Sequence, residues 1–142
     1  MKILELLTKN RIIGNVGENA AARYLRWHGY RILERNFVAE GAEIDIIAKK
    51  KHLIAFVEVK TRNIKSLGYK EARPGSSVTP EKQRKILKTA SRYVGYKHNG
   101  LVKRFDVIEV YLDSSDGKTR IKEIRHLENT FDLNTAYKRT AH

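Results

Sequence analysis

The feature that most constrains the fold is a nearly continuous apolar run, LIAFVEV, at residues 53–59. An apolar strand of this kind is usually buried on both faces, so we expect it at the centre of a sheet. Glu58 lies near the end of the run, and a carboxylate in a central strand is costly unless it is paired or binds a metal. One segment therefore predicts both a sheet and a candidate site.

Asp45 lies in a second strand-like segment, residues 43–48, which a tight turn at residues 49–51 separates from the apolar run. Side chains alternate between the two faces of a strand, so Glu58 and Lys60 point to the same face. If the two segments pair as a hairpin, Asp45 can lie on that face too. Two carboxylates and an ammonium group at one place can hold a divalent cation and activate a water molecule.

The composition limits the class of protein. The chain has 142 residues, which is enough for one compact domain with a real core. It has no apolar run long enough to span a bilayer, and its N-terminus lacks the pattern of a signal peptide, so we expect no membrane partner. The absence of cysteine excludes thiolate catalysis, cysteine zinc sites and disulfides, and it fits a cytoplasmic protein.

The strongest global feature is charge. Lysine and arginine total 29, aspartate and glutamate total 16, and the net charge is +13. Such an excess attracts polyanions and raises their encounter rate, so nucleic acid is the first partner to consider. A basic surface kept for solubility, or one with affinity for ribosomes or anionic lipid, is the alternative.

The order of elements predicts an α/β fold with a mixed β-sheet between helices. Residues 1–13 are expected to form an N-terminal arm or a short helix that Gly14 interrupts, residues 14–133 one domain, and residues 134–142 a flexible tail. The expected elements of the domain are a helix at 15–28, strands at 30–37, 43–48 and 52–61, a loop at 63–79, a helix that starts at Pro80 after the N-cap Thr79, a strand at 104–112 and a strand from Arg120.

Mg²⁺, or Mn²⁺ in its place, suits the proposed site because Mg²⁺ takes oxygen ligands and keeps several waters. Asp45 and Glu58 would supply carboxylate oxygens and Val59 a backbone carbonyl, while Lys60 would orient the water or stabilise charge on a phosphate. Glu43 shares the face of Asp45 and is a supporting carboxylate or, slightly favoured, a solvated strand residue. The E-x-K pattern is common, so an exposed hairpin with an ordinary salt bridge is the competing interpretation.

Residues outside the strands also have competing interpretations. Glu18 follows Asn15 by three residues, the spacing of a capping box, but it also borders the apolar stripe of its helix and could reach the metal. Gln83, in the first turn of the next helix, is either a plain surface residue or a side chain that holds a water or a phosphate. The basic residues suited to a phosphate backbone are Arg62, Lys65, Lys70, Arg73, Lys82, Arg84 and Lys85.

The chain resembles the YraN-like family of small bacterial proteins from about Gly14 to Phe131. Five motifs in the family's order carry this resemblance: GENAAARYLRWHGYRILERNF, GAEIDIIA, FVEVKTR, VTPEKQR and RFDVIEV. That family is similar to the PD-(D/E)xK nuclease superfamily and especially to archaeal Holliday-junction resolvases, although Ile44 stands where the superfamily name has proline. The resemblance implies a restriction-endonuclease-like fold, with a central mixed sheet flanked by helices.

By this resemblance Glu18 corresponds to the helix-borne acidic residue, Asp45 and Glu58 to the two strand acids, and Lys60 to the motif lysine. Gln83 falls in the V-T-P-x-K-Q segment and becomes an accessory candidate. The resemblance implies a metal-dependent endonuclease acting on DNA more than RNA, with branched or structured DNA as a candidate substrate. A nucleic-acid-binding module without turnover is the first alternative, and a structural protein that meets RNA or ribosomes is the second. Because resolvases cut two strands as dimers, a homodimer is a further expectation, although the sequence shows no dimer surface.

Overall fold

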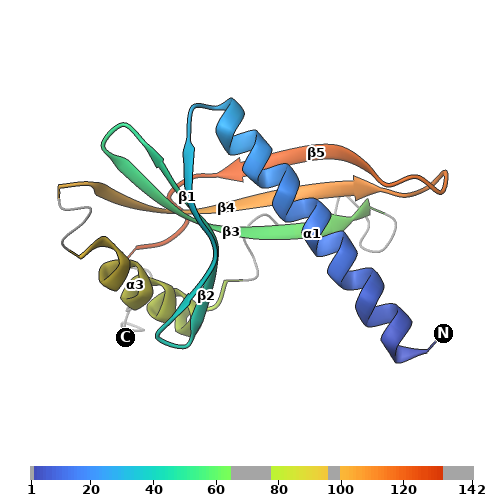
Figure 1. The fold of residues 1–142 in the computed structure, drawn as a ribbon, viewed down its shortest axis with the longest axis horizontal. Helices are drawn as coiled ribbons and strands as arrows, with labels where there is room; N and C mark the ends of the chain where they lie inside the picture. Colours follow the sequence, from blue (N-terminus) through green and yellow to red (C-terminus); the bar gives the residue numbers. More distant parts are fainter. Residues whose placement is uncertain (1, 65–77, 96–99, 133–142) are drawn as a thin grey trace, which may run out of the picture.

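The computed structural model describes residues 2–64, 78–95 and 100–132, in which two helices pack on one five-stranded sheet (Figure 1). The helices are α1 (Ile3–Trp27) and α3 (Pro80–Val94). The strands are β1 (Arg31–Ala39), β2 (Ala42–Lys50), β3 (Leu53–Asn63), β4 (Val102–Asp113) and β5 (Arg120–Leu127). Neither of these two helices is long and apolar enough to cross a membrane.

The sheet has the strand order β1-β2-β3-β4-β5 and is mixed, because β3 and β4 run parallel while the other neighbours run antiparallel. β3 lies in the middle, as its apolar sequence predicts, and its residues 54–58 are buried. A parallel pair needs a crossover connection, and α3 lies in the segment that joins β3 to β4. The predicted α/β fold is therefore confirmed, and its arrangement is consistent with the restriction-endonuclease-like class.

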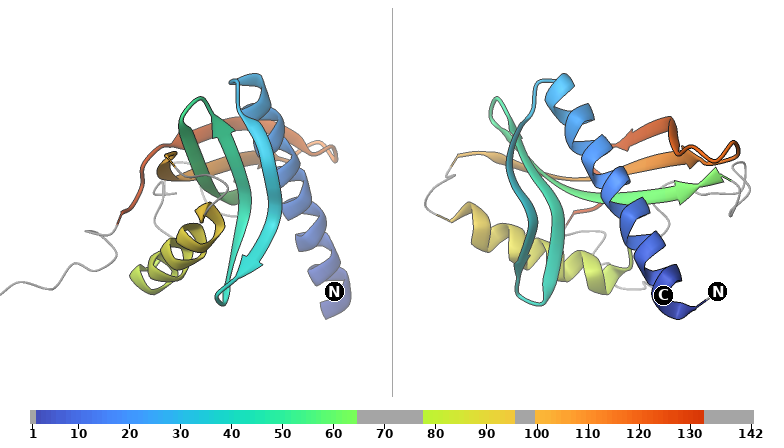
Figure 2. Two further views of the ribbon diagram at one scale, coloured as in Figure 1. Left: turned by 60° about the vertical axis from the view of Figure 1, so that its left-hand side comes forward. Right: turned by 45° about the vertical axis from the view of Figure 1, so that its right-hand side comes forward.

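The helices lie on opposite faces of the sheet, as Figure 2 shows. On the α1 side, Leu25 and three buried alanines of the helix pack against Val57 and Ile108. On the α3 side, Ile86 and Leu87 pack against Phe56 and Phe105. The two central strands are thus covered on both faces, which explains why their sequences are apolar without strict alternation.

The start of α3 agrees with the prediction. Thr79 is the N-cap, and its hydroxyl accepts a hydrogen bond from the backbone N–H of Lys82 at 3.2 Å. Pro80 occupies the first helical position, where its fixed φ suits the helix and its missing N–H removes no bond. These two residues fix where the first turn of α3 begins and hence which side chains it directs towards the sheet.

The predicted interruption at Gly14 is wrong. α1 is a single helix of 25 residues that passes through Gly14. A glycine inside a helix costs only about 1 kcal/mol, and the packing of α1 against the sheet outweighs that cost. Because the N-cap position of α1 is Lys2, Glu18 lies in the helix interior and the capping box with Asn15 is wrong as well.

The turn between β2 and β3 is shorter than predicted. Lys49 and Lys50 extend β2 and pair with Ile54 and Leu53, so the turn consists of residues 51–52. Lys49 is therefore in the strand, whereas Lys51 is in the turn and adopts a φ of 55°. Most of the predicted loop at 63–79 and all of the predicted tail at 134–142 lie outside the described residues.

Candidate metal and catalytic site

The candidate site lies where β2 separates from β3. The two strands pair from Lys50 and Leu53 as far as Ile46 and Val57, where the pairing stops. The same register, continued by one step, places Asp45 opposite Glu58. Opposite residues of an antiparallel pair point to one face, so the strands bring the two predicted acids together.

A side-chain hydrogen bond continues the contact between the strands beyond this point. The Oδ2 atom of Asp45 accepts a hydrogen bond from the backbone N–H of Val59 at 2.7 Å. The N–H and C=O of one strand residue face the same neighbouring strand, so the Val59 carbonyl is directed towards the same gap. This orientation agrees with the expected carbonyl ligand, whose role stays a prediction.

Glu58 is the most buried acid of the site, with 8% of its surface exposed. Two ammonium groups reach its Oε1 atom: the Nζ of Lys60 at 3.3 Å and the Nζ of Lys82 at 2.5 Å. Lys60 shares the face of Glu58 as predicted. Lys82, expected from the sequence to face a phosphate backbone, instead directs its ammonium from the first turn of α3 towards Glu58.

The electrostatics of the site favour an added positive charge. Burial, and then the negative charge of Glu58, raise the pKa of Asp45 to about 7, although the Val59 hydrogen bond opposes this shift. Burial lowers the pKa of Lys82, but its hydrogen bond and attraction to Glu58 outweigh this and leave it raised. Two neighbouring carboxylates are difficult to ionise together in a buried site, and a bound cation would remove that difficulty.

Glu18 is directed towards these acids from α1. Burial raises its pKa, and the charges of Glu43 and Glu58 raise it further, while Arg35 opposes them. The Oε2 atom of Glu18 lies 4.0 Å from the guanidinium of Arg35. Because Glu18 does not form the predicted capping box, its orientation favours the second interpretation, a carboxylate beside the site.

Gly17 explains how α1 comes so close. A Cβ atom at this position would overlap the side chain of Thr61 on β3. Only glycine permits this approach of helix and strand, which sets the neighbouring Glu18 above the place where β2 and β3 separate. Gly14, three residues earlier, has open space around it and no such role.

The remaining predicted residues differ in their surroundings. Gln83 donates from Nε2 to the Val78 carbonyl at 3.0 Å, while its buried Oε1 has no hydrogen-bond partner in the described parts of the chain. The buried Nε atom of Arg62 likewise lacks an acceptor there. Lys85 lies 3.7 Å from Glu81 on the surface of α3, where Arg84 is half-buried. The three loop cations, Lys65, Lys70 and Arg73, lie outside the described residues.

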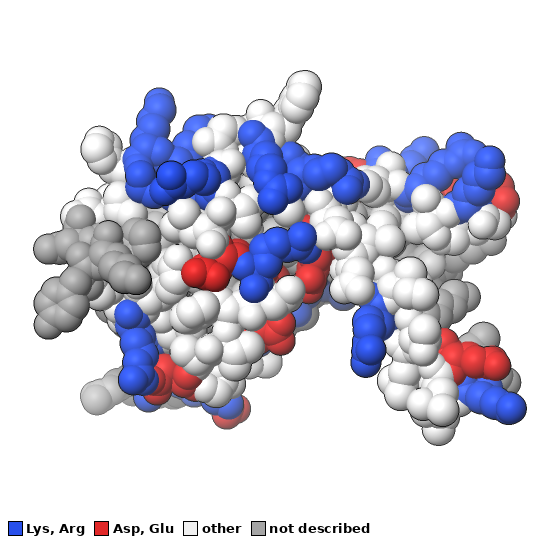
Figure 3. All heavy atoms as spheres, in the orientation of Figure 1, with Lys and Arg blue, Asp and Glu red and all other residues white. Residues whose placement is uncertain are grey.

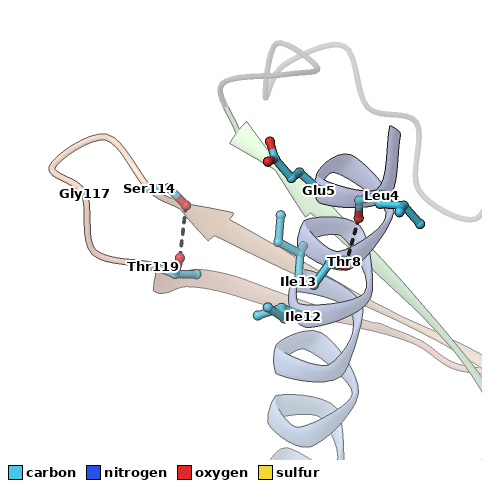
Figure 4. Close-up of a pocket in the computed structure, with 8 residues that line it drawn as sticks. All are labelled: Leu4, Glu5, Thr8, Ile12, Ile13, Ser114, Gly117 and Thr119. Atoms are coloured by element: carbon cyan, nitrogen blue, oxygen red, sulfur yellow. Dashed lines mark hydrogen bonds between the residues drawn. The ribbon is translucent and has the colours of Figure 1, made fainter. Parts of the chain in front are cut away.

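A cavity of about 400 Å³ opens over the site between β2 and the first turn of α3. Asp45, Glu58 and Lys82 line it, together with Glu43, Thr79, Glu81 and Lys85. A larger hollow of about 660 Å³ lies between the N-terminal half of α1 and the β4–β5 turn (Figure 4). That hollow is mainly apolar, and among the described side chains that line it Glu5 is the one that carries a charge, so the smaller cavity is the better candidate for chemistry.

The carboxylates of the site suit a divalent cation that keeps several of its waters. Within residues 2–64, 78–95 and 100–132, no three His, Cys, Asp or Glu side chains form a ready metal centre. Mg²⁺ does not require three, because it retains several waters and is often held by one or two carboxylates plus substrate phosphates. Asp45 and Glu58 provide two carboxylates beside an open cavity, so the residues present fit Mg²⁺ or Mn²⁺.

Charges of both signs occur on the face of the molecule that α1 and β1 cross. Figure 3 shows a few acidic side chains in the middle of the face that α1 and β1 cross, with basic side chains most dense along its upper edge. An acidic centre within a basic surface would attract a polyanion and yet repel it at one place unless a cation lies between them.

Comparison with known proteins identifies the family. The profile of the Uncharacterised protein family UPF0102 matches residues 17–110. The chain belongs to this family. A UPF0102 protein of Clostridium botulinum strain Loch Maree is 47% identical over 119 residues, which cover 82% of this chain and 94% of the relative. A UPF0102 protein of Caldanaerobacter subterraneus is 42% identical over 122 residues, covering 85% and 95%.

UPF0102 membership confirms the resemblance to YraN-like proteins. The match contains every residue of the candidate site, from Glu18 on α1 to Lys82 and Gln83 on α3. The further resemblance to nucleases is not part of this finding and stays a prediction.

Sequence reasoning did not foresee the contact between Lys82 and Glu58, which are 24 positions apart. The N-cap Thr79 predicted where α3 begins, and so placed Lys82 in its first turn. What the sequence lacked was the position of α3 over the end of β3, which depends on the packing of Ile86 and Leu87 against the sheet.

Proposed function

We propose that this UPF0102 protein is a metal-dependent endonuclease that hydrolyses phosphodiester bonds in DNA. The observation that carries the proposal is the convergence of Asp45 and Glu58, with Lys60 beside them, at the open end of the β2–β3 pair. A purely structural site would pair each acid with a base. Here Asp45 is half-buried beside other carboxylates, and its hydrogen bond to Val59 is the one that the described residues show.

Each residue of the site has its own role in the proposed reaction. Asp45 and Glu58 would hold Mg²⁺ or Mn²⁺, with Glu18 near them. The cation would polarise the scissile phosphate and lower the pKa of a bound water. The ammonium groups of Lys60 and Lys82 lie next to Glu58 on long side chains. Each could turn towards a phosphate oxygen once a cation neutralises the Glu58 carboxylate. Lys85 at the rim of the cavity and Arg84 on the same helix are suited to the phosphate backbone.

The substrate and setting are part of the proposal. The net charge of +13 favours a polyanionic substrate, and the resemblance to resolvases favours branched or structured DNA over RNA. We expect the protein to act in the cytoplasm, without a membrane partner, and a homodimer would suit symmetric cleavage of two strands.

A second candidate function is a nucleic-acid-binding module without turnover. The contact of both Lys60 and Lys82 with one oxygen of Glu58 favours it, because two ammonium groups can neutralise that carboxylate without a metal. Asp45 argues against it, since a pure binder gains nothing from a second, half-buried acid that faces an anionic backbone.

Cleavage assays distinguish the two candidates. Purified protein is incubated with linear, single-stranded, flapped and four-way-junction DNA in Mg²⁺, Mn²⁺ or EDTA. We expect cleavage that requires the cation and falls about 100-fold or more in Asp45→Asn and in Glu58→Gln. The matched control is Glu81→Gln, which removes a carboxylate from the wall of the same cavity but leaves both strand acids in place.

Two results would count against the nuclease. Cleavage that persists in both strand variants would show that another site, or a contaminant, is responsible. Binding of DNA without cleavage under every metal would favour the second candidate instead.

A further inference from the structure

A second candidate site lies at the other side of α1, where Trp27 is 89% exposed. Trp27 is the one tryptophan in the chain. Because this large aromatic side chain remains in water, it contributes little to the stability of the fold. Its exposure beside a groove indicates a binding role. It borders a groove of about 310 Å³ between the C-terminal part of α1 and β5.

The groove has an apolar floor and aromatic walls. Ala20 from α1 and Ile121 and Ile124 from β5 line it, and Ile121 is 40% exposed. Tyr24 and His28 lie next to Trp27, with their ring centroids 4.1 Å apart. The His28 Nδ1 atom lies 2.8 Å from the Tyr24 carbonyl, a hydrogen bond that holds the imidazole in place. Flat rings of this kind suit a flat aromatic ligand.

Positive charge surrounds this groove. Arg23 lines it, and Arg26 lies one helical turn further along the same exposed surface. Arg31 is exposed at the start of β1, just after the turn that ends α1. Among the described residues none of these three arginines forms an ion pair, so their charges are available to a ligand. The upper edge of Figure 3, over the end of α1 and over β5, shows basic side chains gathered there.

We propose that the groove between α1 and β5 binds an unpaired base of a nucleic acid, which stacks on Trp27 while Arg23 and Arg26 contact the adjacent phosphates. Aromatic stacking together with basic residues is how proteins hold single strands without sequence preference. A duplex buries its bases against one another and offers no free ring, so this groove selects unpaired nucleotides, such as those at a junction, flap or end.

This groove is separate from the acidic site. Trp27 follows Glu18 by nine residues, which is about 14 Å along α1 and half a turn around it. The inference therefore adds a substrate feature to the proposed nuclease, but its binding step does not require cleavage. Its test can be performed in EDTA, where failure of the metal site has no effect on the result.

The fluorescence of Trp27 can report binding at the groove directly. We expect its fluorescence to be quenched by a 12-nucleotide oligo-dT, much less by a 12-base-pair duplex, and not by inorganic polyphosphate, which offers charge without bases. Binding of labelled oligo-dT, measured by anisotropy, should weaken about tenfold in Trp27→Ala and be retained in Trp27→Phe. Val38→Ala, which trims another exposed apolar side chain on β1, is the matched control and should bind like the wild type.

The arginine contacts have a test of their own. Arg23→Gln should weaken oligo-dT binding and reduce the slope of log affinity against log salt by about one unit. Arg92→Gln removes the same charge from α3, where Arg92 pairs with Glu40, and should leave the slope unchanged.

Three results would overturn the inference. The first is oligo-dT binding with unaltered fluorescence, and the second is equal affinity for oligo-dT in Trp27→Ala and the wild type. The third is a shift of Trp27 emission with vesicles of anionic lipid but not with oligo-dT, which would assign the groove to a membrane surface.

Discussion

Two aspartates of the same sheet, Asp45 on β2 and Asp106 on β4, differ in how their charge is balanced. Asp106 is buried and accepts hydrogen bonds from Arg104 at 2.6 and 2.8 Å, from His126 at 2.8 Å and from the backbone N–H of Asn129 at 3.0 Å. Burial opposes ionisation, but these bonds outweigh it and lower its pKa.

Asp45 has the opposite surroundings. It is bonded to Val59, and the carboxylates of Glu58, Glu18 and Glu43 act on it as well as the ammonium group of Lys82. Burial first, and then these carboxylates, raise its pKa to about 7. Burial alone therefore does not identify a functional acid. Asp106 serves the fold because its neighbours satisfy it, whereas Asp45 lacks such a set of donors, as the proposed role in holding a cation requires.

The largest loss of stability should come from a substitution of Asp106, whose hydrogen bonds are satisfied. Asp106→Asn leaves the mostly buried guanidinium of Arg104 without its principal partner. We expect a loss of about 3–5 kcal/mol in the free energy of unfolding, measured by urea denaturation. A loss below about 1 kcal/mol would contradict a structural role for this network.

The next effect concerns the approach of α1 to the sheet, which brings Glu18 near Asp45. Gly17→Ala should destabilise the protein by about 1–3 kcal/mol, despite the better helix propensity of alanine, because the new methyl group meets Thr61. Gly14→Ala is the matched control in the same helix and should stabilise by about 0.5–1 kcal/mol, since nothing lies near that position. Equal effects in thermal unfolding would show that the close contact is absent.

A smaller effect of opposite sign is expected at Asp45. The unfolded chain releases this proton near its ordinary pKa of 3.8, but the folded protein releases it only near 7. The folded state therefore holds the extra proton between these values, and stability declines as the pH rises through that window. In EDTA at pH 8, Asp45→Asn should stabilise the protein by about 1–2 kcal/mol, because the amide keeps an acceptor for Val59 without the charge.

The pH profile separates this explanation from a packing effect. The advantage of Asp45→Asn should vanish when unfolding is measured near pH 4, where the wild-type carboxyl is protonated. A gain that is independent of pH would refute the assignment of a raised pKa to Asp45.

The sequence predicted the parts of the molecule that depend on local pattern. The apolar run before Val59 predicted the central strand, alternation placed Glu58 and Lys60 on one face, and Thr79-Pro80 predicted the start of α3. The predicted helix break at Gly14 was wrong because the packing of the long helix α1 outweighs the low helix propensity of glycine. The position of Lys82 could not be predicted either, since it depends on how α3 packs across the sheet.

The groove beside Trp27 shows the same limit from another direction. Local sequence patterns indicate no role for Trp27 or His28, which lie within the predicted helix at 15–28. Their significance depends on exposure and on the approach of β5, which is remote in sequence. Local patterns thus predicted the strand acids, while the second candidate site required the fold.

Asp45 and Glu58 are proposed to hold a divalent cation, and direct Mn²⁺ binding tests this proposal without any nuclease assay. Electron paramagnetic resonance at pH 8 counts free Mn²⁺ as protein is added. We predict one site in the wild type, with affinity at least about tenfold weaker in Asp45→Asn and Glu58→Gln. Affinity should be tighter in Lys82→Met, which removes the ammonium from Glu58, than in its control Lys85→Met. No Mn²⁺ bound by the wild type, or equal binding by the wild type and both acid variants, would contradict the claim.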